Sequence, residues 1–121
     1  MTKRIIIAGS RNFNNYSLLT SAMYNLLVNE MISGVEVEIV SGTAKGADQL
    51  GERFAKDHNY PIKQFPADWN THGKKAGYLR NKQMAEYADM LVAFWDGESK
   101  GTKNMIDLAE KNGLIVEVVR F

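Results

Sequence analysis

The stretch VSGTAKGADQL, residues 40–50, places two glycines, small polar residues and a lysine between an apolar run and a helical pattern. The run before it, VEVEIV (35–40), predicts a strand, and residues 47, 50, 51 and 54 recur at the spacing of a helix that packs on a sheet. A strand, a glycine-rich loop and a helix in this order are typical of an α/β fold. The stretch therefore indicates the fold class. It also raises the question of whether the loop only turns the chain or holds an anion as well.

The same unit recurs along the chain. Short apolar runs predict further strands at residues 4–9, 61–65, 89–95 and 114–119. Further helices are expected at about residues 16–31, at about 76–87 and around Thr102, whereas residues 66–75 are expected to be irregular. This alternation predicts a single Rossmann-like domain over residues 1–121, with three layers: a five-stranded parallel sheet and helices on both of its faces.

Composition narrows the class of protein. The 121 residues suffice for one compact domain, 45% are hydrophobic, and the net charge of +1 gives no strong field that would attract nucleic acid or a membrane. The absence of cysteine excludes disulfides, thiolate metal sites and a cysteine nucleophile, and His58 and His72 stand alone without metal-ligand spacing. Neither a signal peptide nor a membrane span is evident. We expect a soluble cytoplasmic protein with no metal, no cofactor and no membrane partner.

Three loops are predicted at the edge of the sheet where ligands of parallel α/β folds bind, beyond the carboxyl ends of the strands. They are GSRNF (9–13), SGTAKGAD (41–48) and WDGESKGT (95–102), and all are rich in glycine, serine or threonine. Small residues let the backbone approach a ligand, and a following helix offers free amides and a positive dipole end. Neither a Walker A loop nor a G-x-G-x-x-G fingerprint is present, which argues against an NTPase or a standard NAD site.

We therefore predict that these loops converge on one cleft for an anionic ligand. The predicted ligand-binding residues in them are Gly9, Ser10, Arg11, Ser41, Gly42, Thr43, Ala44, Gly46, Asp48, Trp95, Asp96, Gly97, Ser99, Lys100, Gly101 and Thr102. The alternative is that the glycines only turn the chain, an explanation that weakens when three such loops share one edge. Asp48 can equally serve its own helix, since a carboxylate in the first turn complements the helix dipole.

Several larger side chains are expected around the same cleft. Arg11 and Arg80 carry the planar fork of donors that suits phosphate, and Trp69 and Trp95 offer rings on which a base can stack. Each has an ordinary alternative, because an arginine can form a surface salt bridge and Trp95 can simply end a buried strand. The lysine pair at 74–75 could screen phosphate, but such a pair is more often solvated surface.

Four motifs in order, GSR, SGTAKGAD, RNKQMAEYAD (80–89) and ESKGT (98–102), resemble the SLOG superfamily, which unites the DNA-processing protein A (Smf) proteins with the Lonely guy phosphoribohydrolases. The pattern DW...GKKAG..RN..M over residues 68–84 is similar to the branch called the YspA, or cpYpsA-related, SLOG family. The resemblance covers almost the whole chain. It implies a Rossmann-like fold that binds a nucleotide-derived ligand, with Arg80 and Asn81 in its motif, and a homodimer or larger homo-oligomer.

The resemblance to the Lonely guy enzymes, which cleave the N-glycosidic bond of nucleoside monophosphates, is incomplete. Their arginine in R-x-x-x-M matches Arg80, with Met84 following, and their phosphate loop partly matches residues 97–102. Met105 occupies the position of their catalytic glutamate, and Asp107 is turned about 200° around the helix from it. A methionine can neither stabilise a cationic sugar nor transfer a proton, as glycosidic cleavage requires.

The favoured prediction is therefore binding without cleavage. The protein would hold a small nucleotide, ADP-ribose-like or cyclic, at the carboxyl edge of the sheet, as a sensor or a sequestering protein. One alternative is a nucleotide-processing hydrolase, for which Arg80, Asp48, Asp96 and Glu98 are the candidate catalytic residues. Another is a single-stranded DNA-binding module resembling DNA-processing protein A, against which the balanced charge and the lack of a basic stripe argue. Whether the protein is an enzyme stays open at this point.

Overall fold

The protein folds around one five-stranded sheet in which all strands run parallel, in the order β3-β2-β1-β4-β5. The structure is a computed structural model that describes residues 2–121, except for the side chain at position 35. The strands span Lys3–Gly9 (β1), Val37–Ser41 (β2), Ile62–Gln64 (β3), Met90–Trp95 (β4) and Ile115–Arg120 (β5). The helices span Tyr16–Asn29 (α1), Ala47–Asp57 (α2), Trp69–His72 (α3), Ala76–Tyr87 (α4) and Lys100–Lys111 (α5), with 3₁₀ turns at Gly34–Glu36 (η1) and Gly73–Lys75 (η2). The predicted Rossmann-like α/β fold is thus confirmed.

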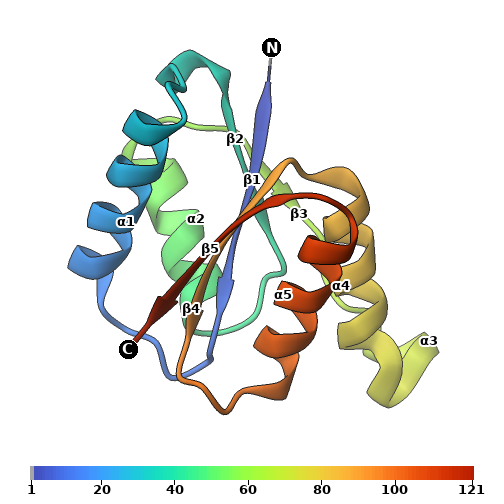
Figure 1. Cartoon of the computed structure of the whole chain (residues 1–121). Helices are drawn as coiled ribbons and strands as arrows, with labels where there is room; N and C mark the ends of the chain where they lie inside the picture. The colour runs from blue at the N-terminus through green and yellow to red at the C-terminus, as the bar shows by residue number, and fades with distance from the viewer. Residues whose placement is uncertain (1) are drawn as a thin grey trace.

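Helices cover both faces of the sheet and give the molecule three layers, with α1 and α2 on one face and α4 and α5 on the other (Figure 1). The central strand β1 shows why. Ile5 and Ile7 belong to the apolar core beside α1 and α2, whereas Ile6 and Ala8 belong to the core beside α4 and α5. A strand that is buried on both faces needs a continuous apolar run, and the sequence of β1 supplies one. Within residues 2–121, none of the helices has the length and apolar character needed to span a membrane.

The order of the strands reverses beside β1. From β1 the chain moves outward through β2 to β3, and then crosses back to β4, which pairs with the other side of β1. A crevice therefore opens where the loops after β1 and β4 leave the sheet. Ser10 N donates to Phe94 O (2.9 Å) and Asp96 N donates to Ser10 Oγ (3.3 Å), so these two loops are tied side by side at the base of the crevice.

Three segments differ from the expectation. Residues 35 and 36, predicted as the start of a strand, belong to the 3₁₀ turn η1, and β2 begins at Val37. Residues 66–75 contain the short helix α3 and the turn η2 instead of irregular chain. The cause is Asp68, whose carboxylate accepts a hydrogen bond from Thr71 N (3.1 Å) and so caps a single helical turn. Helix α1 ends at Asn29 and not near residue 31, where Met31 adopts a left-handed φ of 55° that is incompatible with a right-handed helix.

Candidate ligand-binding site

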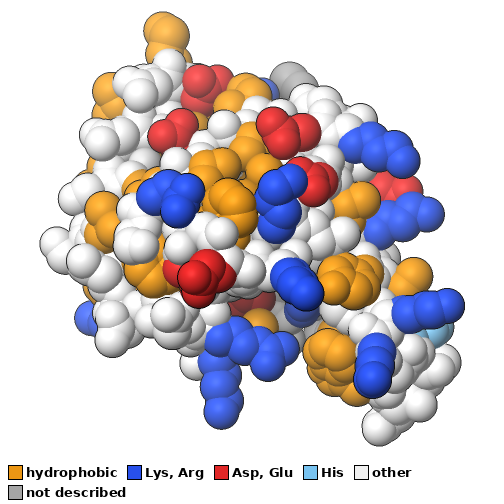
Figure 2. All heavy atoms as spheres, turned by 60° about the horizontal axis from the view of Figure 1, so that its bottom comes forward, with side chains coloured by type: hydrophobic (Ala, Val, Ile, Leu, Met, Phe, Trp, Pro, Cys, Tyr) orange, Lys and Arg blue, Asp and Glu red, His pale blue; other side chains and the backbone are white. Residues whose placement is uncertain are grey.

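A cavity of about 210 Å³ opens at the carboxyl edge of the sheet, beside the point where the strand order reverses. All three glycine-rich loops reach it. Their lining residues are Gly9, Arg11, Ala44, Asp48, Ser99, Gly101 and Thr102. Figure 2 looks onto this edge and shows Lys and Arg side chains gathered around a hollow. The structure therefore brings the three loops together around one space.

Helices α3 and α4, with η2 between them, form another wall of the cavity. Trp69, Arg80 and Asn81 are predicted site residues, and all three line the cavity. Lys74 lines it as well, although sequence reasoning favoured solvated surface for this residue. Tyr78 was missed, and the signal that could have found it is its place inside the pattern DW...GKKAG..RN..M. The lining is completed by Ala8, Gly77, Met84 and Met105.

The N-terminus of α5 forms one end of the cavity. Ser99 caps this helix, because its Oγ accepts a hydrogen bond from Thr102 N (3.3 Å) and lies 3.0 Å from Thr102 Oγ1. The amides of residues 100 and 101 precede the capped amide and have no partner within the helix. Because Gly101 lines the cavity, the positive end of the helix dipole lies beside it. A helix end of this kind favours an anionic group.

Asp96 shapes the same loop and does not line the cavity. Its Oδ1 accepts hydrogen bonds from Glu98 N (2.9 Å) and Ser99 N (2.8 Å), and these bonds lower the pKa of Asp96. Glu98 is exposed and also lies outside the lining. Of the candidate catalytic residues, the structure thus places only Asp48 and Arg80 in the cavity wall.

In the loop after β2, part of the backbone that could bind an anion already has partners. Thr43 N donates to Ser41 Oγ (3.1 Å) and Ala44 N donates to Asp48 Oδ2 (3.1 Å), so side chains of the same loop already satisfy two of its amides. Ser41 Oγ in turn donates to Glu52 Oε2 on α2 (2.6 Å). This loop presents to the cavity only Ala44 and the carboxylate-bearing Asp48.

The two glycines of that loop allow its neighbours to approach closely. A Cβ at Gly42 would lie 2.7 Å from Arg80 Nη1 and 2.8 Å from Asp48 Oδ2, so a larger residue would displace these charged groups. Gly46 adopts a φ of 81°, and a Cβ there would lie 2.5 Å from Ser10 O. Neither glycine lines the cavity. Gly42 leaves room for the side chains of Arg80 and Asp48, and Gly46 lets the loop after β2 pack against the loop after β1.

Arg80 links the loop after β2 to α4 and, through Asn81, to α5. Its Nη1 donates to Gly42 O and its Nε donates to Asn81 Oδ1 (2.9 Å), while Asn81 Nδ2 donates to Asn104 Oδ1 (3.0 Å). Burial lowers the pKa of the Arg80 guanidinium, and the nearby charge of Asp48 opposes that effect. Within residues 2–121, Nη2 of Arg80 forms no hydrogen bond, so the guanidinium keeps one donor group for a ligand.

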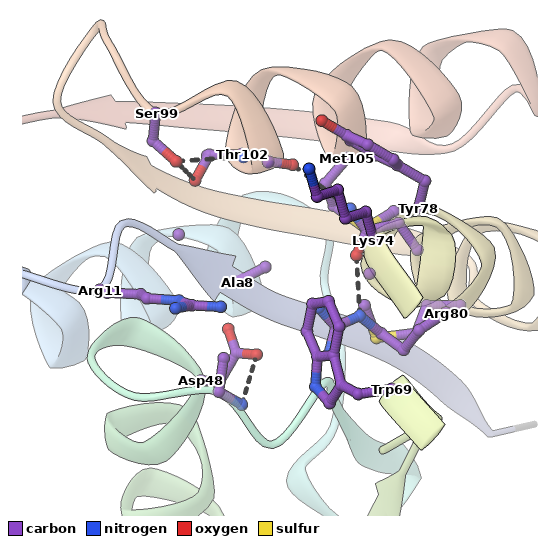
Figure 3. Close-up of a pocket in the computed structure, with 16 residues that line it drawn as sticks. Ala8, Arg11, Asp48, Trp69, Lys74, Tyr78, Arg80, Ser99, Thr102 and Met105 are labelled. Carbon is purple, nitrogen blue, oxygen red and sulfur yellow. Dashed lines mark hydrogen bonds between the residues drawn. The ribbon is translucent and has the colours of Figure 1, made fainter. Parts of the chain in front are cut away.

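Asp48 is the buried carboxylate of the site. It is only 4% exposed and lies in the first turn of α2. Burial raises its pKa from 3.8 to about 6, against the opposing effects of the hydrogen bond from Ala44 N and the charge of Arg80. Figure 3 shows the carboxylate directed into the space between Arg11 and Trp69. Asp48 therefore loses its charge in milder acid than an ordinary aspartate does.

Two aromatic side chains stand at the cavity with about half of their surface exposed, Trp69 at 52% and Tyr78 at 49%. The other predicted stacking ring, Trp95, lies outside the cavity. Its Nε1 donates to Ser99 O (3.1 Å), and its ring centre lies 5.1 Å from the guanidinium carbon of Arg120. Because side chains alternate along β4, Trp95 packs against the apolar cluster beside α5. Trp95 therefore ends a buried strand, which is the alternative to a stacking role.

Met105 lines the cavity and is 2% exposed. A thioether thus stands in the wall at the position that the resemblance to the Lonely guy enzymes assigns to their glutamate. Asp107, the next carboxylate along the helix, is exposed and pairs with Lys103 (2.7 Å). Among the described residues that line the cavity, Asp48 is the only one with a carboxylate.

The remaining predicted residues lie outside the lining, and several of them shape the loops. They are Ser10, Ser41, Gly42, Thr43, Gly46, Trp95, Asp96, Gly97 and Lys100. Gly97, for example, adopts a left-handed φ of 87°, as the turn before α5 requires. In the part of the chain that the structure describes, no group of three or more His, Asp or Glu side chains is arranged to hold a metal ion.

Comparison with known proteins agrees with these motifs. The model of the YspA, cpYpsA-related SLOG family matches residues 3–72, more than half of the chain. That match runs from β1 through α3 and includes two of the three glycine-rich loops. The Gene 61 protein of Mycobacterium phage D29 is 35% identical over an alignment 120 residues long, and the alignment covers 94% of each chain. Membership of a SLOG family suggests a function related to nucleotides. On the extent of these matches, the chain belongs to the YspA, cpYpsA-related SLOG family.

Proposed function

We propose that the protein binds a small nucleotide or nucleotide-derived ligand, ADP-ribose-like or cyclic, in this cavity and acts as a sensor or a sequestering protein. The observation that carries the proposal is the placement of Trp69 and Ser99 on opposite sides of one space (Figure 3). An exposed indole offers a surface on which a base can stack, and the helix end that Ser99 caps favours a phosphate. Arg11 and Lys74 add positive charge to the lining.

The cavity is small for a complete ligand of this kind. Ligand pockets usually measure about 300–1,000 Å³, whereas this one has about 210 Å³. A second copy of the chain could enlarge it, because Trp69, Tyr78 and Leu79 leave apolar surface exposed on α3 and α4. The expected homodimer is therefore part of the proposal. Light scattering at high micromolar concentration tests it, and a monomer both with and without nucleotide would count against it.

Binding without cleavage is supported by Met105, since the wall lacks the glutamate that related hydrolases use. The test incubates the purified protein with a panel of nucleoside monophosphates and ADP-ribose derivatives. Calorimetry measures binding, and chromatography follows the release of free base. Saturable binding without base release is the expected result. Sustained release by the wild type that is lost in Arg80→Ala would overturn the binding-only function.

A nucleotide hydrolase is the second candidate, and one observation favours it. Asp48 lines the cavity with a pKa raised to about 6, a value suited to a general base near neutral pH. If this candidate is right, Asp48→Asn abolishes base release while the fold is kept. The variant Met105→Glu tests whether the lack of a glutamate at this position is the only reason that base release does not occur. We expect little activity from that variant, because a catalytic group must be held within about 0.5 Å of its productive position.

A further inference from the structure

We infer that Asp48 recognises the ribose of the ligand, by accepting a hydrogen bond from a hydroxyl group of the sugar, the 2′-hydroxyl above all. This inference rests on the proposed function, because it assigns one part of the same nucleotide to one side chain. It goes beyond that function by defining the class of ligand. The site would select ribonucleotides over deoxyribonucleotides.

The carboxylate of Asp48 has one oxygen left for a ligand. Oδ2 accepts the hydrogen bond from Ala44 N at 3.1 Å. Across residues 2–121, Oδ1 forms no hydrogen bond and the carboxylate forms no ion pair. No fully buried side-chain oxygen or nitrogen lacks a partner in this part of the chain, so Oδ1 is not sealed inside the protein. Since Asp48 lines the cavity, a bound molecule can reach this oxygen.

The group that meets this oxygen must be a neutral donor. A phosphate would be repelled by the carboxylate and is better placed at the N-terminus of α5 or beside Arg11. A divalent cation is not favoured, because no cluster of three or more acidic or histidine ligands exists within residues 2–121. A nucleotide offers two kinds of neutral donor, the ribose hydroxyls and the exocyclic amino group of some bases. The experiment must separate these two sources.

The position of Asp48 favours the ribose. In Figure 3 its carboxylate faces the space between Arg11 and Trp69, while Ser99 and Thr102 lie across that space. A base stacked on Trp69 and a phosphate at the helix end beside Ser99 would leave the sugar, which joins them, in the middle of the cavity. The free oxygen of Asp48 faces this middle part.

The hydrogen bond from Ala44 N does not require a charge at this position, since an asparagine could accept it, and the structural gain left to a charge is its interaction with the dipole of α2. The fold nevertheless buries a carboxylate there, and burial raises its pKa to about 6. The hydrogen bond from Ala44 N and the charges of Arg80 on α4 and Arg11 after β1 act in the opposite direction, while Glu52 on α2 adds to the increase. The dipole of α2 does not account for the oxygen of Asp48 that has no hydrogen-bond partner within residues 2–121 and lies at the cavity, whereas recognition of a ligand does.

Calorimetry at pH 7.5 with three probes tests the inference: AMP, 2′-deoxy-AMP, and IMP, which lacks the exocyclic amino group. The wild type is expected to bind AMP and IMP alike and 2′-deoxy-AMP about tenfold more weakly, the effect of one lost hydrogen bond to a charged acceptor. Asp48→Asn keeps an oxygen for Ala44 N and removes the charge, so it should bind AMP about as weakly as the wild type binds 2′-deoxy-AMP. Glu52→Gln is the matched control on the same helix. Its carboxylate contacts Ser41 outside the cavity, and the preference for AMP should persist.

The outcomes separate the inference from the function on which it rests. At pH 5, protonation of Asp48 should reduce the preference of the wild type for AMP over 2′-deoxy-AMP several-fold, and it should leave Asp48→Asn unchanged. Equal binding of AMP and 2′-deoxy-AMP by the wild type overturns the ribose assignment and leaves the proposed function standing. Binding of AMP but not of IMP assigns the oxygen to the base and overturns it as well. If none of the three monophosphates binds, the ribose assignment is overturned, and the panel of ADP-ribose derivatives decides the proposed function separately.

Discussion

The loops after β2 and β4 have nearly the same composition and present opposite groups to the cavity. SGTAKGAD (41–48) and DGESKGT (96–102) each contain two glycines, a serine, a threonine, a lysine and an aspartate. In the first loop, two amides bond to side chains of the loop itself, and an aspartate lines the cavity. In the second, the aspartate bonds to amides of the loop, and the start of a helix lines the cavity.

The place of the aspartate relative to the helix start accounts for the difference. Asp48 is the second residue of α2, so its side chain lies within the first turn, buried, and its pKa is raised to about 6. Asp96 lies three residues before the N-cap Ser99, where its carboxylate accepts two amide hydrogen bonds that lower its pKa. Composition therefore shows that the backbone of a loop can approach a ligand. It does not show whether amides or a carboxylate will face that ligand.

The largest effect is expected from a glycine of the first loop. Gly46→Ala would place a Cβ 2.5 Å from Ser10 O and 2.6 Å from Arg11 O, at a φ of 81°. Because these contacts are to backbone, we expect the free energy of unfolding to fall by about 3 kcal/mol. Gly101→Ala in the second loop is the matched control, with nothing within 4 Å of the added Cβ, and should change it by less than about 1 kcal/mol. Urea unfolding measures both, and equal losses would contradict the difference between the loops.

Asp48, the aspartate of the first loop, should make the folded protein less stable as the pH rises, whereas most aspartates act in the opposite direction. Because folding raises the pKa of Asp48 from 3.8 to about 6, its proton stabilises the native state fully below pH 4, and this contribution is lost as the pH rises through 6. Asp48→Asn should therefore be more stable than the wild type at pH 8, by up to about 3 kcal/mol. The advantage should vanish near pH 4. Urea unfolding at pH 4, 6 and 8 measures it.

Asp96→Asn is the counterpart in the second loop and should behave in the opposite way. The amide hydrogen bonds from Glu98 and Ser99 lower the pKa of Asp96, so its contribution to stability is present above the unfolded-state pKa and is lost as the pH falls through the folded-state pKa. The variant should be less stable than the wild type at neutral pH, and the gap should narrow in acid. A shift of both variants in the same direction would contradict the opposite environments of the two aspartates.

The fold could be predicted from the sequence because a parallel sheet buried on both faces requires uninterrupted apolar runs, such as residues 5–8 and 90–94. For the candidate site, the sequence predicted where the loops lie, since every loop after a parallel strand reaches the same edge of the sheet. It did not predict which side chains of these loops face the cavity. The direction of a side chain depends on contacts between residues that are far apart in the sequence. Trp95 turns toward α5 because of the pleat of β4, whereas Trp69 reaches the cavity from a single turn that Asp68 caps and that leaves no periodic pattern.

Arg80 belongs to neither loop and is linked to both. Its Nη1 donates to Gly42 O of the first loop, and its Nε donates to Asn81, whose Nδ2 donates to Gly101 O of the second (3.3 Å). Arg80→Ala should remove a charge-assisted contact to the ligand worth about 1.5–3 kcal/mol, a loss of roughly ten- to hundredfold in affinity for AMP. Calorimetry measures the loss. Arg53→Ala, at an exposed arginine of α2 outside the cavity, is the control and should bind normally. If Arg80→Ala binds AMP with unchanged affinity, the side chain of Arg80 does not contact the ligand.

The smallest effect is expected from the cap of the second loop. Ser99 Oγ accepts from Thr102 N (3.3 Å), and Asn15 caps α1 in the same way, accepting from Leu18 N (3.0 Å), but outside the cavity. Ser99→Ala and Asn15→Ala should each lower the free energy of unfolding by about 1 kcal/mol, the usual cost of a lost cap.

Only Ser99→Ala should also weaken the binding of AMP, by roughly threefold, because a loosened first turn holds the amides of residues 100 and 101 less firmly toward an anion. Thermal unfolding and calorimetry on the same samples separate the two effects. If both variants lose the same affinity for AMP, the loss results from lower stability and not from the position of the cap at the cavity. If neither variant loses affinity, the start of α5 does not hold the phosphate. The loop after β4 would then resemble the loop after β2 after all, with its small residues serving only to pack the chain.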